Sequence, residues 1–444
     1  MKKFKFFTRL LCVVLVFVLM ASFSLHLNAL PVLESTDSIS FFDSETASIL
    51  INLYADSDTN FSISNTRPLK DSDGDNAYTV VELSPYGYAI FNNSNTLLVE
   101  ACFQEGVTSP IPMNNNVNYY YVGPSSFAIK QGVNFVSADD GTLISTQSIQ
   151  AVSEFEERIS VINAQQLNAN SLQPQVAVPP ISQPITKSVA PSYFSNLNAF
   201  GDNILGTCTV ISAAMLFGYY EHNIHNGYIA DNYTTSASYM SSAGTTEAFH
   251  QLLCDYVYTD QEPGGIDPNR ATLRLNAYLQ SRSLPVSFEY VYPGTVRNTQ
   301  IKVVELINNN HPATAGFYEE LGGDMNHSVL VYGYSYIPAT TIRATTDEIN
   351  YDTLLFRVHY GWLNELDKRD VLLSSSWFKR CGYIIDCTET GTHYNAVDDY
   401  TGNNYHSGQY HYFEIRTACC SCGRADSYDW EMRLCNGQYD LEIN

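Results

Sequence analysis

Positive charge is scarce in this sequence of 444 residues, which has 23 Lys and Arg residues against 46 Asp and Glu residues and a formal net charge of −23 at pH 7. Nucleic acids and anionic membrane surfaces attract proteins through clustered basic side chains. The composition therefore excludes both as expected partners and favours solubility. Hydrophobic residues make up 45% of the chain and aromatic residues 13%, which is enough for two or three packed cores.

Long apolar segments are also lacking, apart from one near the N-terminus. Basic residues up to Arg9 precede an apolar run over residues 10–20, and a stretch of polar and small residues ends near Ala29. This order is typical of a secretory signal peptide, and the run is short for a membrane span. We therefore expect residues 1–29 to be a signal peptide, the protein to be secreted and extracellular, and no membrane contact after signal cleavage. An uncleaved membrane anchor is the alternative.

Two parts precede the expected site. Residues 30–172 contain short apolar runs separated by turn residues, for example residues 78–83 and 88–91, and this pattern predicts a β-rich unit. Residues 173–190 are punctuated by prolines and have neither helical nor strand periodicity. We expect them to form an exposed linker that is accessible to proteolysis.

Residues 191–381 begin with helical patterns and continue with extended runs. Helices are expected over residues 208–220, 248–256, 268–280 and 299–307, and strands over residues 313–317, 328–336, 354–360 and 371–373. Helices followed by a mainly antiparallel sheet predict an α+β domain.

The cysteines do not have the even, dense spacing of a disulfide scaffold in the main body of the chain. Six of the ten lie between Cys381 and Cys435. Together with histidines they mark residues 382–444 as a small Cys/His-containing C-terminal module, in which a zinc site and disulfides such as Cys381–Cys387 are both open. No metal ligand and no cofactor is assigned.

Cys208 lies where a polar turn meets a long apolar helical pattern. The start of a helix presents backbone N–H groups and a partial positive charge, which favour the thiolate form of a cysteine. Cys208 is therefore a candidate nucleophile, and its own backbone N–H with the side-chain amide of Asn203 could hold an oxyanion.

A thiol nucleophile needs a base, and His327 is the candidate because it opens a predicted strand after a glycine-rich approach. On the adjacent predicted strand, His359 could orient the ring of His327, and Trp362 could shield their bond from water. The alternative is that these residues are ordinary surface and sheet-edge side chains.

At these residues the chain resembles the papain-like cysteine peptidases, most closely the streptopain-like secreted bacterial branch, over about residues 194–377. In that branch a Gly-x-Cys turn opens a helix, the base opens a strand ending in Gly-Tyr, and an Asn-x-Gly-Trp strand supplies the orienting residue and a tryptophan. The matching segments here are Gly206-Thr207-Cys208, Asn326-His327 with Gly333-Tyr334, and His359-Tyr360-Gly361-Trp362.

The chain departs from the family pattern at two positions. Asp202 stands where the family has a glutamine six positions before the nucleophile, and Asn203 could replace it as a donor. His359 stands in the place of the asparagine, which is closer to the Cys-His-His arrangement of cell-wall amidases in the same superfamily.

The resemblance implies a papain-like α+β catalytic domain over residues 191–381, preceded by a β-rich prodomain that fills the active-site cleft as an inhibitor and is removed by cleavage in the linker. The expected function is a secreted cysteine peptidase zymogen that hydrolyses protein or peptide substrates. A peptidoglycan amidase or endopeptidase, and a catalytically inactive binding protein on a peptidase scaffold, are the alternatives. For the N-terminal unit, an independent adhesion or spacer domain is the other reading.

Overall fold

The computed structural model divides the chain into two compact units, Met1–Phe41 and Phe42–Asn444, and all described residues belong to the second. They are residues 42–55, 59–94, 96–145, 149, 153, 155–156, 183–200, 206–230, 243–258, 266, 268–317, 327–338, 349–362, 368–386, 413–419 and 424–429. The expected signal peptide, Asn203 and most of the C-terminal module lie outside this set. Within it, no helix has the length and apolar character needed to cross a membrane.

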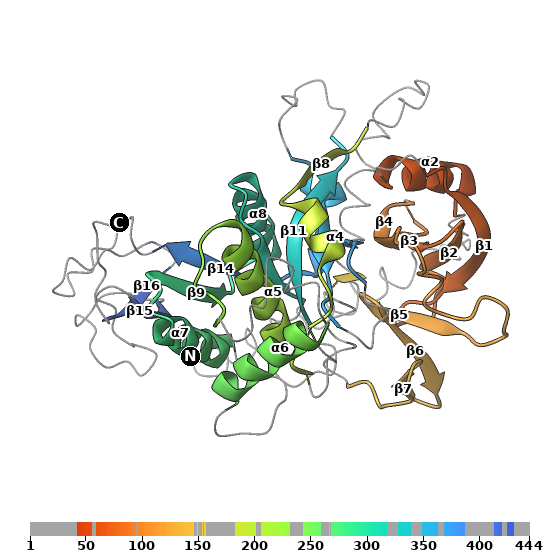
Figure 1. The fold of residues 1–444 in the computed structure, drawn as a ribbon. Helices are drawn as coiled ribbons and strands as arrows, with labels where there is room; N and C mark the ends of the chain where they lie inside the picture. The colour runs from red at the N-terminus through yellow and green to blue at the C-terminus, as the bar shows by residue number, and fades with distance from the viewer. Residues whose placement is uncertain are drawn as a thin grey trace, which may run out of the picture. The chain divides into compact units, whose positions relative to one another are not determined.

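One eleven-stranded antiparallel sheet dominates the described chain (Figure 1). Its strands follow the order β1-β2-β3-β4-β13-β12-β11-β10-β14-β9, and β8 also pairs with β11. The strands are β1 (Ser62–Leu69), β2 (Tyr78–Ser84), β3 (Tyr88–Asn92), β4 (Leu98–Cys102), β8 (Ile185–Ser188), β9 (Val286–Val291), β10 (Ala313–Gly316), β11 (Ser328–Tyr336), β12 (Leu355–His359), β13 (Val371–Ser374) and β14 (Arg380–Asp386).

Two smaller sheets and a set of helices complete the described elements. The smaller sheets are β5 (Tyr119–Gly123), β6 (Ser126–Gln131) and β7 (Asn134–Ser137), and β15 (Phe413–Cys419) with β16 (Arg424–Asp429). The α-helices are α2 (Ser44–Tyr54), α4 (Pro191–Asn196), α5 (Cys208–Asn223), α6 (Ala243–Val257), α7 (Pro268–Ser281) and α8 (Val296–Asn308). The mixed α+β class with a large antiparallel sheet is confirmed, as are the helices and strands expected over residues 208–373.

Helix α5 is the central helix of the described chain and begins at Cys208. It packs against β10 and β11 and against α6, and Figure 1 shows it beside β11. Residues 210–220 of the helix are buried on every side, and Val210, Ile211 and Ala213 are fully buried. A helix without a polar face belongs inside a core, so the first turn of α5 is held rigidly against the sheet.

The expected linker is not irregular throughout. Residues Ile185–Ser188 form strand β8, which pairs with β11 so that Ser188 lies opposite Gly333. A Cβ atom on Gly333 would lie 2.6 Å from the Ser188 hydroxyl oxygen, so glycine is what lets the two backbones approach. The sequence hides this strand because its side chains are exposed or half-buried and show no alternation.

The sheet is continuous across the two regions that the sequence separates. Strand β4, from the expected β-rich unit, pairs with β13, with Leu372 opposite Ala101. Leu98 and Leu355 belong to one hydrophobic cluster, which spans the same junction. The two regions therefore share both a backbone ladder and a core.

Candidate active site

Cys208 is the first residue of α5 and is 3% exposed. The preceding residue, Thr207, is the N-cap, and its carbonyl accepts hydrogen bonds from the backbone N–H groups of Val210 and Ile211 at 2.9 and 3.0 Å. The backbone N–H of Ser328 hydrogen-bonds the Cys208 sulfur. This contact joins the start of α5 to the start of β11.

Burial raises the pKa of the Cys208 thiol, although the hydrogen bonds from Ser328 and Thr209 lower it. The net direction is opposite to the thiolate expected from the sequence. A helix N-terminus stabilises a thiolate, but removing the sulfur from water costs more here. The thiol is therefore protonated at neutral pH in this structure.

His327 lies immediately before β11, next to the residue whose amide contacts Cys208. Its ring centroid lies 4.8 Å from that of Trp362 and 6.2 Å from that of Phe317. Burial lowers the pKa of His327 to about 4, so the imidazole is neutral. Its Nδ1 atom is buried and has no hydrogen-bond partner among the described residues.

Trp362 lies beside His327, and its expected shielding role stays a prediction. Trp362 is 1% exposed and packs on His327 and, at 4.8 Å between ring centroids, on Tyr360. His359 is fully buried in β12, and its Nε2 atom lies 3.2 Å from the carbonyl oxygen of Leu197. The orienting role of His359 and the oxyanion role of Asn203, which lies outside the described residues, stay predictions.

Gly361 lets the chain after β12 pack closely against α5, because it has no side chain. It has a φ of 75°, and a Cβ atom there would lie 2.7 Å from Ile211 Cγ2 and 2.8 Å from Met215 Cε. Its carbonyl oxygen accepts a hydrogen bond from the backbone N–H of Phe200 at 2.9 Å. Because Trp362 follows directly, the missing side chain of Gly361 sets the distance between the tryptophan and α5.

Replacing Gly361 with alanine is therefore expected to destabilise the protein by about 1–3 kcal/mol more than a left-handed backbone alone would, because the methyl group overpacks the face of α5. Gly141→Ala is the matched control, since Gly141 also has a φ of 75° and nothing within 4 Å of its Cβ position. Urea unfolding of both variants measures the difference. Equal losses of stability would contradict the close contact with α5.

No family model and no curated protein sequence matches this chain. Among solved structures, a fragment of Prevotella intermedia prointerpain A with a cysteine-to-alanine mutation is similar at a TM-score of 0.34 and 14% sequence identity. The match covers 72% of this chain and 97% of that chain. Similarity at this level shows no family membership, so the functional argument rests on the residues of this chain.

A second Cys–His pair lies on α6. The sulfur of Cys254 is 3.3 Å from Nε2 of His250, one helical turn away, and both side chains are buried. Burial raises the pKa of Cys254 to about 12 and lowers that of His250 to about 4, so the pair is neutral. We did not single out this pair from the sequence, although its i, i+4 spacing on a predicted helix is a visible signal.

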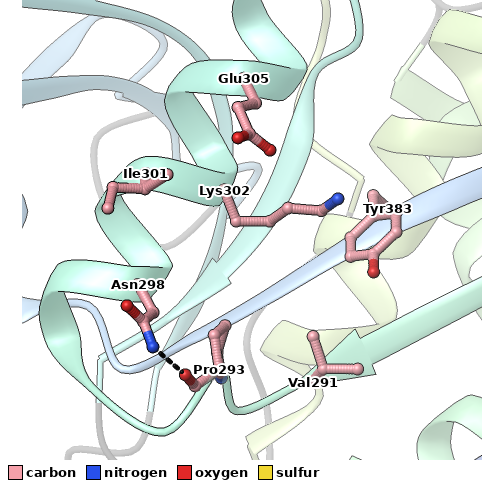
Figure 2. A pocket seen from close by; sticks show the side chains of 7 residues that line it. All are labelled: Val291, Pro293, Asn298, Ile301, Lys302, Glu305 and Tyr383. Carbon is pink, nitrogen blue, oxygen red and sulfur yellow. Dashed lines mark hydrogen bonds between the residues drawn. The ribbon is translucent and has the colours of Figure 1, made fainter. Parts of the chain in front are cut away.

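A pocket of about 280 Å³ lies between α8 and the strands β9 and β14 (Figure 2). Lys302 extends over the ring of Tyr383, with Nζ 4.8 Å from the centroid, and Asn298 donates a hydrogen bond to the Pro293 carbonyl oxygen. None of the expected site residues lines it. The pocket is therefore separate from the candidate active site.

Metal-ligand chemistry finds no support in the part of the chain that the structure describes, where no group of three or more His, Cys, Asp or Glu side chains could hold an ion. Cys381 is buried in β14 and is not in a disulfide. Its suggested disulfide partner Cys387 and the histidines of the C-terminal module lie outside the described residues. For that module, a zinc site and disulfides both remain open.

Proposed function

We propose that this chain is a secreted cysteine peptidase made as a zymogen, with Cys208 as the nucleophile and His327 as the general base. One observation carries the proposal: the backbone N–H of Ser328, the residue after His327, hydrogen-bonds the sulfur of Cys208. The start of the helix that carries the thiol and the start of the strand that follows His327 are thus in contact. The packing of Trp362 on His327 supports the same assignment.

In the proposed reaction, His327 takes the proton of the Cys208 thiol, and the thiolate attacks the scissile carbonyl carbon. The backbone N–H of Cys208 and the amide of Asn203 hold the oxyanion of the tetrahedral intermediate. Collapse breaks the C–N bond, and the imidazolium of His327 protonates the leaving amine. Water, deprotonated by His327, then hydrolyses the thioester, which releases the acid and restores the thiol.

The protonation states of the pair support a latent precursor. Burial raises the pKa of the Cys208 thiol, which stays protonated, and desolvation lowers the pKa of the His327 imidazole, which stays neutral. Activation would need to expose the pair so that a proton can move between them. In the proposal, residues 30–172 act as the inhibitory prodomain, and cleavage within residues 173–190 begins activation.

Digestion of casein tests the proposal. The full chain, nicked by a broad-specificity serine protease that is then blocked by a protein inhibitor, is expected to release casein peptides. Treatment of the nicked chain with iodoacetamide is expected to remove that activity, because alkylated Cys208 has no nucleophile. Undiminished casein hydrolysis after complete alkylation of Cys208, checked by peptide mass spectrometry, would exclude a cysteine peptidase.

A second candidate is a peptidoglycan amidase or endopeptidase, which the buried His359 in the asparagine position favours. Muropeptides offered to the same nicked chain separate the two substrates. Release of stem peptides without casein hydrolysis would favour the cell-wall enzyme. A third candidate, an inactive binding protein, is favoured by the raised pKa of Cys208 and predicts neither product.

A further inference from the structure

Three buried hydroxyl groups lie in a row beside Cys208. Ser212, one turn along α5, is fully buried, Ser328 at the start of β11 is 1% exposed, and Tyr290 of β9 is 7% exposed. The hydroxyl oxygens of Ser212 and Ser328 are 3.0 Å apart, and the Ser212 hydroxyl donates to the Thr209 carbonyl oxygen at 3.0 Å. The Tyr290 hydroxyl hydrogen-bonds the Ser328 side chain.

The hydrogen-bond chain ends at the first turn of α5. The Ser212 hydroxyl donates to the Thr209 carbonyl oxygen, and either hydroxyl of the Ser212–Ser328 pair can be the donor between them. The hydrogen bond with Ser328 acts to lower the pKa of Tyr290, so Ser328 can donate to the phenolic oxygen. The three hydroxyls thus connect Tyr290 to the turn whose first residue is Cys208.

Two glycines make room for Tyr290 to take part. The sheet order β9-β14-β10-β11 places β14 and β10 between Tyr290 and Ser328. A Cβ atom on Gly382 of β14 would lie 2.8 Å from Tyr290 Cδ2, and one on Gly316 of β10 would overlap the Tyr290 hydroxyl oxygen. Gly316 lies directly opposite Ser328 in the ladder. The side chain of Tyr290 therefore lies across β14 and β10 at positions where glycines have no side chain, and its hydroxyl reaches Ser328.

The hydroxyl of Tyr290 also lies within electrostatic reach of the Cys208 thiol. Burial raises the pKa of Tyr290 to about 12, and Cys208 is among the groups that raise it. The other ionisable groups near this hydroxyl are Arg380 and Cys381 of β14. At neutral pH the phenol therefore keeps its proton and carries no charge.

On the proposed function of Cys208, we propose that Tyr290 and Ser328 are positioning residues for the nucleophile. The Tyr290 hydroxyl fixes the side chain of Ser328, and Ser328 in turn keeps its backbone N–H on the Cys208 sulfur. A sulfur that is buried and fully desolvated can carry negative charge only if donors are already aimed at it. The hydroxyl chain supplies that support from inside the core.

The test measures the rate at which iodoacetamide alkylates Cys208 of the full chain as a function of pH, with the site identified by peptide mass spectrometry. Tyr290→Phe deletes one hydroxyl and keeps the ring, and Ser328→Ala deletes the next. Both variants keep the backbone N–H of residue 328 and lose only groups that position it, so alkylation at pH 8 is expected to slow by up to roughly tenfold, the value of one hydrogen bond to a charged group, with the rate recovering at high pH. Tyr278→Phe is the control, because its buried hydroxyl donates to the Tyr228 carbonyl oxygen on another part of the core.

A folded Tyr290→Phe variant with the wild-type pH profile would overturn the inference, as would an equal shift in Tyr278→Phe. If Ser328→Ala does not fold, Tyr290→Phe carries the test alone, because it removes no packing surface. The readout needs no substrate. Shifted alkylation profiles in a protein that hydrolyses neither casein nor muropeptides would refute the proposed peptidase while leaving the positioning role in place.

Discussion

Replacing Cys208 with alanine is expected to abolish hydrolysis and to leave the fold intact. Removing a covalent nucleophile lowers turnover by about 10³-fold or more, because no other group can form the acyl intermediate. The substitution deletes one buried sulfur from a helix that is otherwise held by apolar packing, so near-UV circular dichroism should be unchanged. Casein hydrolysis by the nicked chain measures the loss.

The chain provides its own controls for this substitution. Cys254 and Cys381 are also buried cysteines outside any disulfide, and the sulfur of Cys254 lies 3.3 Å from a histidine nitrogen. Cys254→Ala and Cys381→Ala are expected to keep full activity. Turnover that survives in Cys208→Ala, or that disappears in Cys254→Ala, would refute the assignment of the nucleophile.

Replacing Glu100 with alanine is expected to cost about 3–5 kcal/mol of unfolding free energy, the range observed when a buried polar network loses one partner. Glu100 is fully buried in β4, and its carboxyl oxygens accept hydrogen bonds from the hydroxyls of Tyr88 and Tyr121 and from both the backbone N–H and the hydroxyl of Ser125. Alanine would leave all four donors buried without this acceptor. Urea unfolding measures the loss.

Two further variants at acidic positions make this result interpretable. Glu100→Gln is expected to lose less stability, because its oxygen can face the Ser125 N–H while its amide group faces hydroxyls that can turn to accept. Glu247→Ala, at an exposed position of α6, is expected to change stability by less than about 0.5 kcal/mol. A loss in Glu100→Ala no greater than that in Glu247→Ala would contradict the importance of the network.

The Glu100 network also ties the two regions of the sheet together. The ammonium group of Lys368, only 3% exposed, donates to the Ser125 hydroxyl at 2.8 Å. Its position lies between β12 and β13, in the region that the sequence assigns to the catalytic domain. The two regions of the wild-type protein are therefore expected to unfold together, in one cooperative transition.

The sequence predicts the elements of the site region well because periodicity is local. Residues 208–220 have the apolar pattern of a helix, and residues 328–336 form a strand as expected. Burial depends on segments that are distant in sequence, and it determines the protonation states of the site residues. The thiol of Cys208 is protonated because of elements that pack over it from distant parts of the chain, which no inspection of the helix start can reveal.

Buried polar residues were the least predictable from the sequence. Glu100 and Lys368 would ordinarily be expected on the surface, and only the folded chain shows that they share the core with Tyr88 and Tyr121. Tyr290 is similar: its part beside Cys208 depends on two glycines in strands that are neighbours in the sheet but far apart in sequence. By contrast, Trp362 was expected near His327 because the two belong to predicted neighbouring strands, and their rings are in contact.

Because β4 and β13 are joined by backbone hydrogen bonds, cleaving the chain between them would not by itself separate the two fragments. After cleavage within residues 173–190 the two pieces would still be joined by backbone hydrogen bonds and by the Glu100 network, so the nicked protein would be a heterodimer of its own fragments. Pulling the fragments apart would bare an edge strand on each of them, open to pairing with any other chain. Dissociation of the N-terminal region would thus make both fragments prone to aggregation.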